Sequence, residues 1–183
     1  ALLHHRSTKL DCERRCAGCC NTTVHAVPFE MFAVLDAVKR LPTATASTIR
    51  ERARVRRDRT AGMSASQHHD AQMPCPLLVN DLCSIYAARP VACVAAHSID
   101  RTRCVAPTAQ QGAWHLPALA VPGALAAGVV AGAKQRGVDV PTLDFHNALA
   151  SLLERPTRLE RWLDGSDSLG DLLARPEREA PGT

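Results

Sequence analysis

The distribution of cysteine constrains this chain more than any other feature. Four of its eight cysteines fall within nine residues, in the string Cys-Glu-Arg-Arg-Cys-Ala-Gly-Cys-Cys. The other four are single and widely spaced, and the last third of the chain has none. The two sets are Cys12, Cys16, Cys19 and Cys20, and then Cys75, Cys83, Cys93 and Cys104. Any account of the fold has to explain what brings these thiols together.

Clustered cysteines indicate either disulfides or thiolate ligands, depending on the redox compartment. At 183 residues the chain is long enough to bury a core without disulfides. Its first residues contain no apolar stretch long enough for a secretory signal. We therefore expect a soluble cytoplasmic protein whose cysteines bind metal, with a disulfide framework or buried free thiols as the alternatives.

Spacing within the first set predicts which thiols converge. Cys16-Ala-Gly-Cys19 has the form of a metal-binding knuckle, and Gly18 is expected to permit a tight turn that directs both sulfurs at one point. Cys12 precedes Cys16 by four residues, so the two share a face if the segment is helical. Cys20 directly follows Cys19, and adjacent side chains diverge, so Cys20 is expected to serve another centre or to pack.

The cysteines also lie in short strings that occur in a fixed order. The strings are Cys12-x3-Cys16-x2-Cys19-Cys20, Pro74-Cys75-Pro76-Leu77-Leu78, Cys83-Ser84-Ile85-Tyr86 and Arg89-Pro90-x2-Cys93. This order resembles that of the YkgJ-type cysteine-cluster (CxxCxxCC) family, whose members are described as zinc- or iron-chelating proteins. The resemblance covers about residues 12–104 and implies a metal site, without implying a particular reaction.

The ligand type and its spacing narrow the choice of metal. Thiolates are soft ligands that select zinc, copper(I) or iron–sulfur clusters over magnesium and calcium. A zinc ribbon offers two CxxC knuckles, whereas this chain has one followed by single cysteines. An iron–sulfur cluster, such as the [4Fe–4S] type, fits that pattern somewhat better, because its ligands bind different iron atoms. Zinc and a pair of separate centres stay open. All eight cysteines are candidate ligands, with a preferred pool of Cys16, Cys19, Cys75, Cys83 and Cys93.

Thiolates around a metal carry negative charge that neighbouring groups must offset. Arg89 is the best candidate, because Pro90 fixes the backbone close to Cys93. His97 follows Cys93 by four residues and would share its helical face, as a ligand or as a neighbour of the ligands. Other basic residues near the cysteines are more typical of a solvated surface: His25, Arg14, Arg15, Arg101 and Arg103.

Composition predicts a mainly α fold, a small helical domain with irregular cysteine-rich loops. Aromatic residues make up 3% of the chain while alanine and leucine are abundant, which favours packed helices over a β-sandwich. Residues 63–74 are expected to form a loop that delivers Cys75. The apolar stretch 116–133 is expected to be a buried helix, with glycines for close packing, and not a membrane span. Helices are predicted over 28–41, 43–60, 91–97, 118–136, 141–154 and 156–164.

The positions of the cysteines and of the predicted helices divide the chain into three parts. Residues 1–108 form the cysteine-cluster region, residues 109–174 a helical region that packs on it within one compact domain, and residues 175–183 a disordered tail.

Three functions are compatible with these features. The first is a metal-binding module, acting as a structural or interaction unit or as a metal or redox sensor. The second is an iron–sulfur enzyme with redox or Lewis-acid chemistry; the chain has none of the common catalytic motifs, so the sequence leaves open whether it is an enzyme. The third is a nucleic-acid-binding protein that uses the arginine-rich helix between Arg50 and Arg59, although such arginines usually form a solvated face. The expected partner is the metal, with a protein partner open and neither nucleic acid nor a membrane expected.

Overall fold

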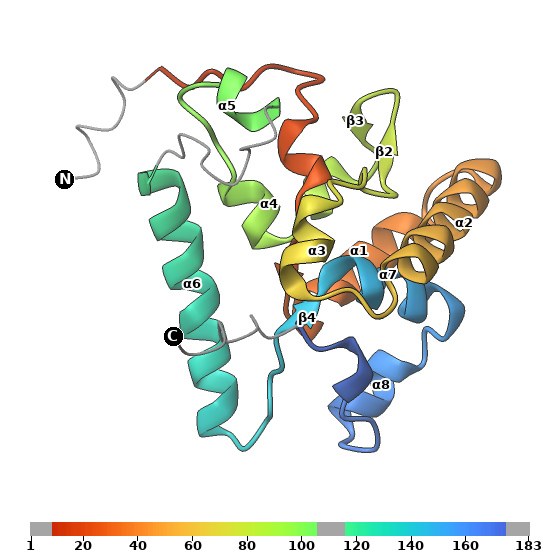
Figure 1. Cartoon of the computed structure of the whole chain (residues 1–183). Coiled ribbons are helices and arrows are strands. Elements are labelled where there is room, and N and C mark those ends of the chain that lie inside the picture. The colour runs from red at the N-terminus through yellow and green to blue at the C-terminus, as the bar shows by residue number, and fades with distance from the viewer. Residues whose placement is uncertain (1–8, 106–115, 175–183) are drawn as a thin grey trace, which may run out of the picture.

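A computed structural model describes residues 9–105 and 116–174 (Figure 1). This part of the chain is mainly α-helical, as the composition predicts, and its strands are two residues long. The disordered tail predicted for 175–183 lies outside the described residues. The helices are α1 (Pro28–Lys39), α2 (Thr43–Thr60), α3 (Ala65–Asp70), α4 (Val91–Ala95), α5 (Thr102–Val105), α6 (Leu116–Gln135), α7 (Phe145–Glu154) and α8 (Arg158–Leu163). The strands are β1 (His25–Ala26), β2 (Leu78–Val79), β3 (Leu82–Cys83) and β4 (Leu143–Asp144), and the 3₁₀ helices are η2 (Gly18–Asn21), η3 (Tyr86–Ala88) and η5 (Gly170–Leu172).

The hydrophobic core lies where α7 packs against α1 and α2. Met31 and Val34 of α1, Ile49 of α2, and Leu149 and Leu152 of α7 are all fully buried. Pro28 occupies the first turn of α1, where its fixed backbone angle and missing N–H cost nothing. The apolar faces of helices from both ends of the chain therefore close over one core.

A short antiparallel pair ties the two halves of the chain together. In it, β1 pairs with β4, with His25 opposite Asp144 and Ala26 opposite Leu143. Because β1 follows the first cysteine set directly, this pairing places the start of α7 beside the cysteine-bearing segment. The C-terminal helices pack on that segment, whereas the boundary proposed at residue 108 stays a prediction.

Several local elements differ from those expected. Residues 65–70 form α3 and not a loop, because the Ser64 hydroxyl accepts from the Gln67 N–H at 3.3 Å and the Gln67 amide oxygen accepts from the Ser64 N–H at 2.9 Å. This reciprocal capping box supports a helix too short to form on its own. The helix predicted from 141 begins only at Phe145, because the preceding two residues are used in β4. Asp144 then caps α7, its carboxylate accepting from the backbone N–H groups of His146 and Asn147.

The apolar helix α6 lies at one edge of the molecule, on the side opposite α2 (Figure 1). It packs on α4 along one side, while Val121, Leu125 and Val129 stay 47%, 69% and 59% exposed. The prediction of a buried helix is therefore wrong. Gly123 and Gly128 face open space and serve no close packing. Within 9–105 and 116–174, the structure contains no helix whose length and apolar character would suffice to cross a membrane.

Candidate metal centre

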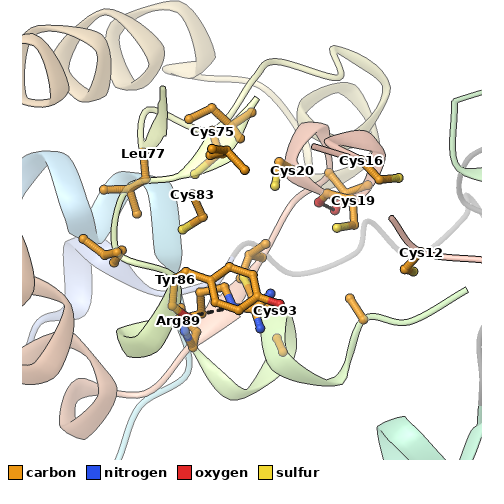
Figure 2. Close-up of a pocket in the computed structure, with 18 of the residues that line it drawn as sticks. Cys12, Cys16, Cys19, Cys20, Cys75, Leu77, Cys83, Tyr86, Arg89 and Cys93 are labelled. Atoms are coloured by element: carbon orange, nitrogen blue, oxygen red, sulfur yellow. Dashed lines mark hydrogen bonds between the residues drawn. The ribbon is translucent and has the colours of Figure 1, made fainter. Parts of the chain in front are cut away.

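Seven of the eight cysteines line one cavity of about 980 Å³. Its walls come from the N-terminal segment with η2, the β2–β3 hairpin, and α4, and Figure 2 shows Cys83 on one side with Cys19 and Cys20 across from it. All eight cysteines are free thiols. Cys104, on α5, is buried and does not line the cavity. The seven are Cys12, Cys16, Cys19, Cys20, Cys75, Cys83 and Cys93.

Five of these thiols lie close enough to influence one another's ionisation, and we call Cys19, Cys20, Cys75, Cys83 and Cys93 the inner group. The Cys20 thiol donates a hydrogen bond to the Cys19 sulfur and lowers the pKa of Cys19 to about 7. The same hydrogen bond, together with burial and the neighbouring thiols, raises the pKa of Cys20. Adjacent in sequence, Cys19 and Cys20 thus face one cavity, contrary to the expectation that their side chains diverge.

Burial dominates the ionisation of the other inner thiols. It raises the pKa of Cys75 to about 11 and that of Cys93 to about 12, and neighbouring thiols add to the effect at Cys93. Burial also raises the pKa of Cys83. These groups are protonated at neutral pH in the absence of a cation, so a metal would take the place of protons.

The remaining three cysteines form an outer group beside the first. Cys104 lies within electrostatic range of Cys16 and Cys12, and also of Cys19 from the inner group. The Cys12 sulfur accepts a hydrogen bond from the Ser98 N–H at 3.2 Å. The sequence placed Cys16 in the preferred ligand pool and Cys20 behind it, whereas the structure puts Cys20 in the inner group and Cys16 in the outer group.

The glycine of the knuckle serves close packing. A Cβ at Gly18 would lie 2.9 Å from the Cys104 Cβ and 3.0 Å from its carbonyl oxygen. No residue with a Cβ atom leaves room for the Cys104 backbone to lie this close to residue 18. Gly18 therefore sets how closely α5 approaches η2, a different role from the tight turn expected from the sequence.

Backbone hydrogen bonds fix the elements that carry the inner group. The N–H of Cys75 donates to the carbonyl oxygen of Cys20 at 2.8 Å. Asn80 and Asp81 adopt positive φ angles of 52° and 61°, which close the hairpin between β2 and β3 and present Cys83. The Val91 N–H, at the start of α4, donates to the Glu30 carboxylate at 2.6 Å and so anchors the helix that carries Cys93 to α1.

The cysteine-bearing part of the sequence matches a known protein family. Residues 11–113 match a family model described as "CxxCxxCC: Putative zinc- or iron-chelating domain". The chain belongs to this family. The resemblance inferred from the cysteine strings is thereby confirmed. No curated protein and no solved structure matches the chain.

In this member of the cysteine-cluster family, an arginine that the sequence assigned to a solvated face is buried. Arg56 is 2% exposed, and its Nη1 donates to the carbonyl oxygens of Met73 and Pro74, directly before Cys75. Burial lowers the pKa of Arg56, whereas the negative charge of a Cys75 thiolate would raise this pKa. A guanidinium in this position favours the thiolate form of Cys75.

The other arginines of α2 are also largely engaged within the chain. Arg52 donates to the Leu78 carbonyl oxygen at 2.7 Å, next to the hairpin. Arg54 pairs with Glu51 and Asp58, and Arg57 pairs with Glu154 on α7 at 2.7 Å. Much of the charge considered for nucleic-acid binding is therefore neutralised by partners or directed inward.

Arg89 lies at the cavity with the inner group. Its guanidinium stacks on the Tyr86 ring, 3.6 Å from the ring centre, and its Nε donates to the Tyr86 carbonyl oxygen at 3.0 Å. Its charge lowers the pKa of Cys19, Cys83 and Cys93 against the effect of burial. A guanidinium in this position favours the thiolate forms of these cysteines; its role beside a metal stays a prediction.

The other basic candidates take different positions. His97 lines the cavity, and its Nδ1 is buried with no hydrogen-bond partner in the described chain. His25, Arg14 and Arg15 line the cavity as well. Arg101 instead forms an exposed pair with Glu13 at 2.6 Å. The side chain of Arg103 lies outside the described part of the structure.

One cavity residue has no counterpart in the sequence analysis. His146, at the start of α7, is 2% exposed and lines the same cavity. Burial and the Arg56 charge lower its pKa well below the usual value, so the ring is neutral. It lies far from every cysteine in sequence and beyond residues 11–113, so no local motif could have indicated it.

The inner thiols are spread over the walls of the cavity. In the described chain, no three His, Cys, Asp or Glu side chains converge closely enough to hold a single ion. A structural zinc requires four donors, with sulfurs about 2.3 Å from the ion. The thiolates of an iron–sulfur cluster bind different iron atoms and are therefore farther apart.

Proposed function

We propose that this protein holds an iron–sulfur cluster through the inner group, with zinc as the alternative metal. The observation that carries this proposal is the placement of Cys19, Cys20, Cys75, Cys83 and Cys93 around one cavity, without convergence on a single point. Family membership supports iron or zinc and leaves the choice between them open.

The surroundings of the inner group suit a negatively charged centre. Thiolate-bound metal is costly to bury unless cations and hydrogen-bond donors oppose its charge. Arg56 and Arg89 reach it from different elements, and both favour the thiolate forms of their neighbours. These two cations supply the charge compensation that such a centre needs.

The proposed role is that of a metal-dependent module, either structural or responsive to metal or redox state. The inner thiols come from four segments. These are η2, the residues that precede β2, strand β3, and helix α4. A centre that bound one thiol from each of these four segments would link them, so that gain or loss of metal would change the surface that they form. This arrangement requires no catalysis.

The proposal is tested by loading the protein anaerobically with ferrous iron and sulfide, and separately with zinc. Iron and sulfide in matching amounts, with a visible absorption band, are expected in the first case. Serine at Cys19 or Cys93 should abolish the band, whereas serine at Cys12 should not. Stoichiometric zinc with no uptake of iron and sulfide would show that the zinc alternative holds.

The size of the cavity favours an iron–sulfur enzyme as a second candidate. Small-molecule sites have volumes of about 300 to 1,000 Å³, and this cavity of about 980 Å³ lies at the upper end of that range. Space beside the centre would admit a substrate to an iron atom without a protein ligand. Cyanide is a suitable probe: a changed EPR spectrum of the reduced cluster would support the enzyme, and an unchanged spectrum would favour the module.

A further inference from the structure

The imidazole of His146 is buried at the cavity without a hydrogen-bond partner. Both ring nitrogens, Nδ1 and Nε2, are inaccessible to solvent and unpaired in the described structure. The residue is 2% exposed and belongs to the cavity wall. Its ring lies edge-on to the Phe145 ring, with centroids 5.2 Å apart.

Such a side chain is costly unless something else binds it. A neutral imidazole carries one donor and one acceptor. Each buried polar group without a partner costs about 1–3 kcal/mol. A leucine or phenylalanine would fill the same position without that cost, so the polar ring indicates a role besides packing.

The neighbouring groups hold His146 in place without satisfying its ring. Asp144 accepts from the backbone N–H of His146 at 3.1 Å and faces His68 Nδ1 at 3.2 Å with its other oxygen. The remaining nearby charge is Arg56, whose Nη1 donates to backbone carbonyls. A neutral imidazole is the form that binds metal.

We propose that His146 supplies a nitrogen ligand to the metal centre of the inner group. The inference rests on the proposed function and extends it, because it places one ligand in α7, outside the residues that match the family model. Zinc, copper and iron all accept imidazole nitrogen. In an iron–sulfur centre, replacing thiolate by imidazole raises the reduction potential. It would also connect the centre directly to the core helix α7.

The test detects histidine nitrogen at the metal and does not depend on activity. Full-length protein labelled with ¹⁵N-histidine is loaded anaerobically with iron and sulfide and reduced, or loaded with cobalt(II) as the probe for a zinc site. Pulsed EPR then measures nitrogen hyperfine coupling in the wild type, His146→Ala, His97→Ala and His25→Ala. His68→Gln is the matched control, since His68 is 3% exposed and lies outside the cavity.

We expect ¹⁵N coupling in the wild type and in the His97, His25 and His68 variants, and its loss in His146→Ala. A centre without histidine coupling in the wild type would overturn the inference while leaving thiolate binding intact. Loss of coupling in His97→Ala or His25→Ala, with His146→Ala unchanged, would overturn it as well. A wild type that binds no metal would instead contradict the proposed function. If His146→Ala does not fold, His146→Gln takes its place, because it keeps a polar side chain and still removes the labelled imidazole.

Discussion

The backbone N–H of Cys75 donates a 2.8 Å hydrogen bond to the carbonyl oxygen of Cys20. This bond joins the two cysteine sets, which α1, α2 and α3 separate in sequence. Immediately before it, the carbonyl oxygens of Met73 and Pro74 accept from buried Arg56. The placement of Cys75 therefore depends on a backbone contact and on a side chain of α2.

Replacing Arg56 with methionine should weaken metal binding. The change removes the buried cation near Cys75 while keeping an unbranched apolar side chain. Loss of a group that supports metal ligands costs about 10–100-fold in affinity. Chelator competition would measure the effect, with exposed Arg50→Met as the control. Equal affinities for the two variants would contradict the role assigned to Arg56.

Replacing Gly18 with alanine should destabilise the fold. The new Cβ would lie 2.9 Å from the Cys104 Cβ, closer than van der Waals contact allows. Overpacking of this kind costs about 1–3 kcal/mol. Gly128→Ala is the matched control, because that position faces open space within α6 and should gain up to about 1 kcal/mol. Urea unfolding measures both, and a neutral Gly18→Ala would show that α5 can shift at no cost.

The carboxylate of Asp167 should stabilise the protein in a pH-dependent way. Asp167 pairs with the buried Arg158 at 2.8 Å, and Arg158 holds the pKa of that carboxyl at about 2. Because the unfolded chain has a carboxyl pKa of about 3.9, the stabilisation is present above that pH and is lost as pH falls toward 2.

Asp167→Asn is accordingly expected to cost about 1–3 kcal/mol at neutral pH. The difference from wild type should shrink between about pH 4 and pH 2. Urea unfolding at several pH values checks this, and a difference independent of pH would contradict the ion pair.

Serine in place of Cys93 should lower both metal content and the melting temperature of the loaded protein. Cys93 belongs to the inner group, and metal binding of this kind is coupled to folding. Serine in place of Cys104, which is buried away from the cavity, should leave metal content unchanged. Metal analysis and thermal unfolding of both variants make the comparison; equal metal loss in the two would contradict the division into inner and outer groups.

Local signals in the sequence predicted the helices well. Pro28 indicates the start of α1, and positive-φ Gly137 follows the end of α6. The family was also recognisable, because the cysteine strings are contiguous. The exposure of α6 was not predictable from apolar composition, because burial depends on which neighbour covers a helix. Here α4 packs along one side of α6, while Val121, Leu125 and Val129 stay exposed.

Long-range contacts limited what could be predicted about the site. Cys20 joins the inner group through its bond to Cys75, and Arg56 is buried because residues 73–74 cross α2. His146 reaches the cavity because β4 pairs with β1. None of these contacts leaves a signal in the spacing of neighbouring residues.

The most direct test of the central claim is elemental analysis with an absorption spectrum, on protein purified without oxygen. Bound iron with matching sulfide and a brown visible band is the expected result, or, under the alternative, colourless protein with bound zinc. Metal-free protein with all eight thiols accounted for as disulfides or free cysteines would contradict it.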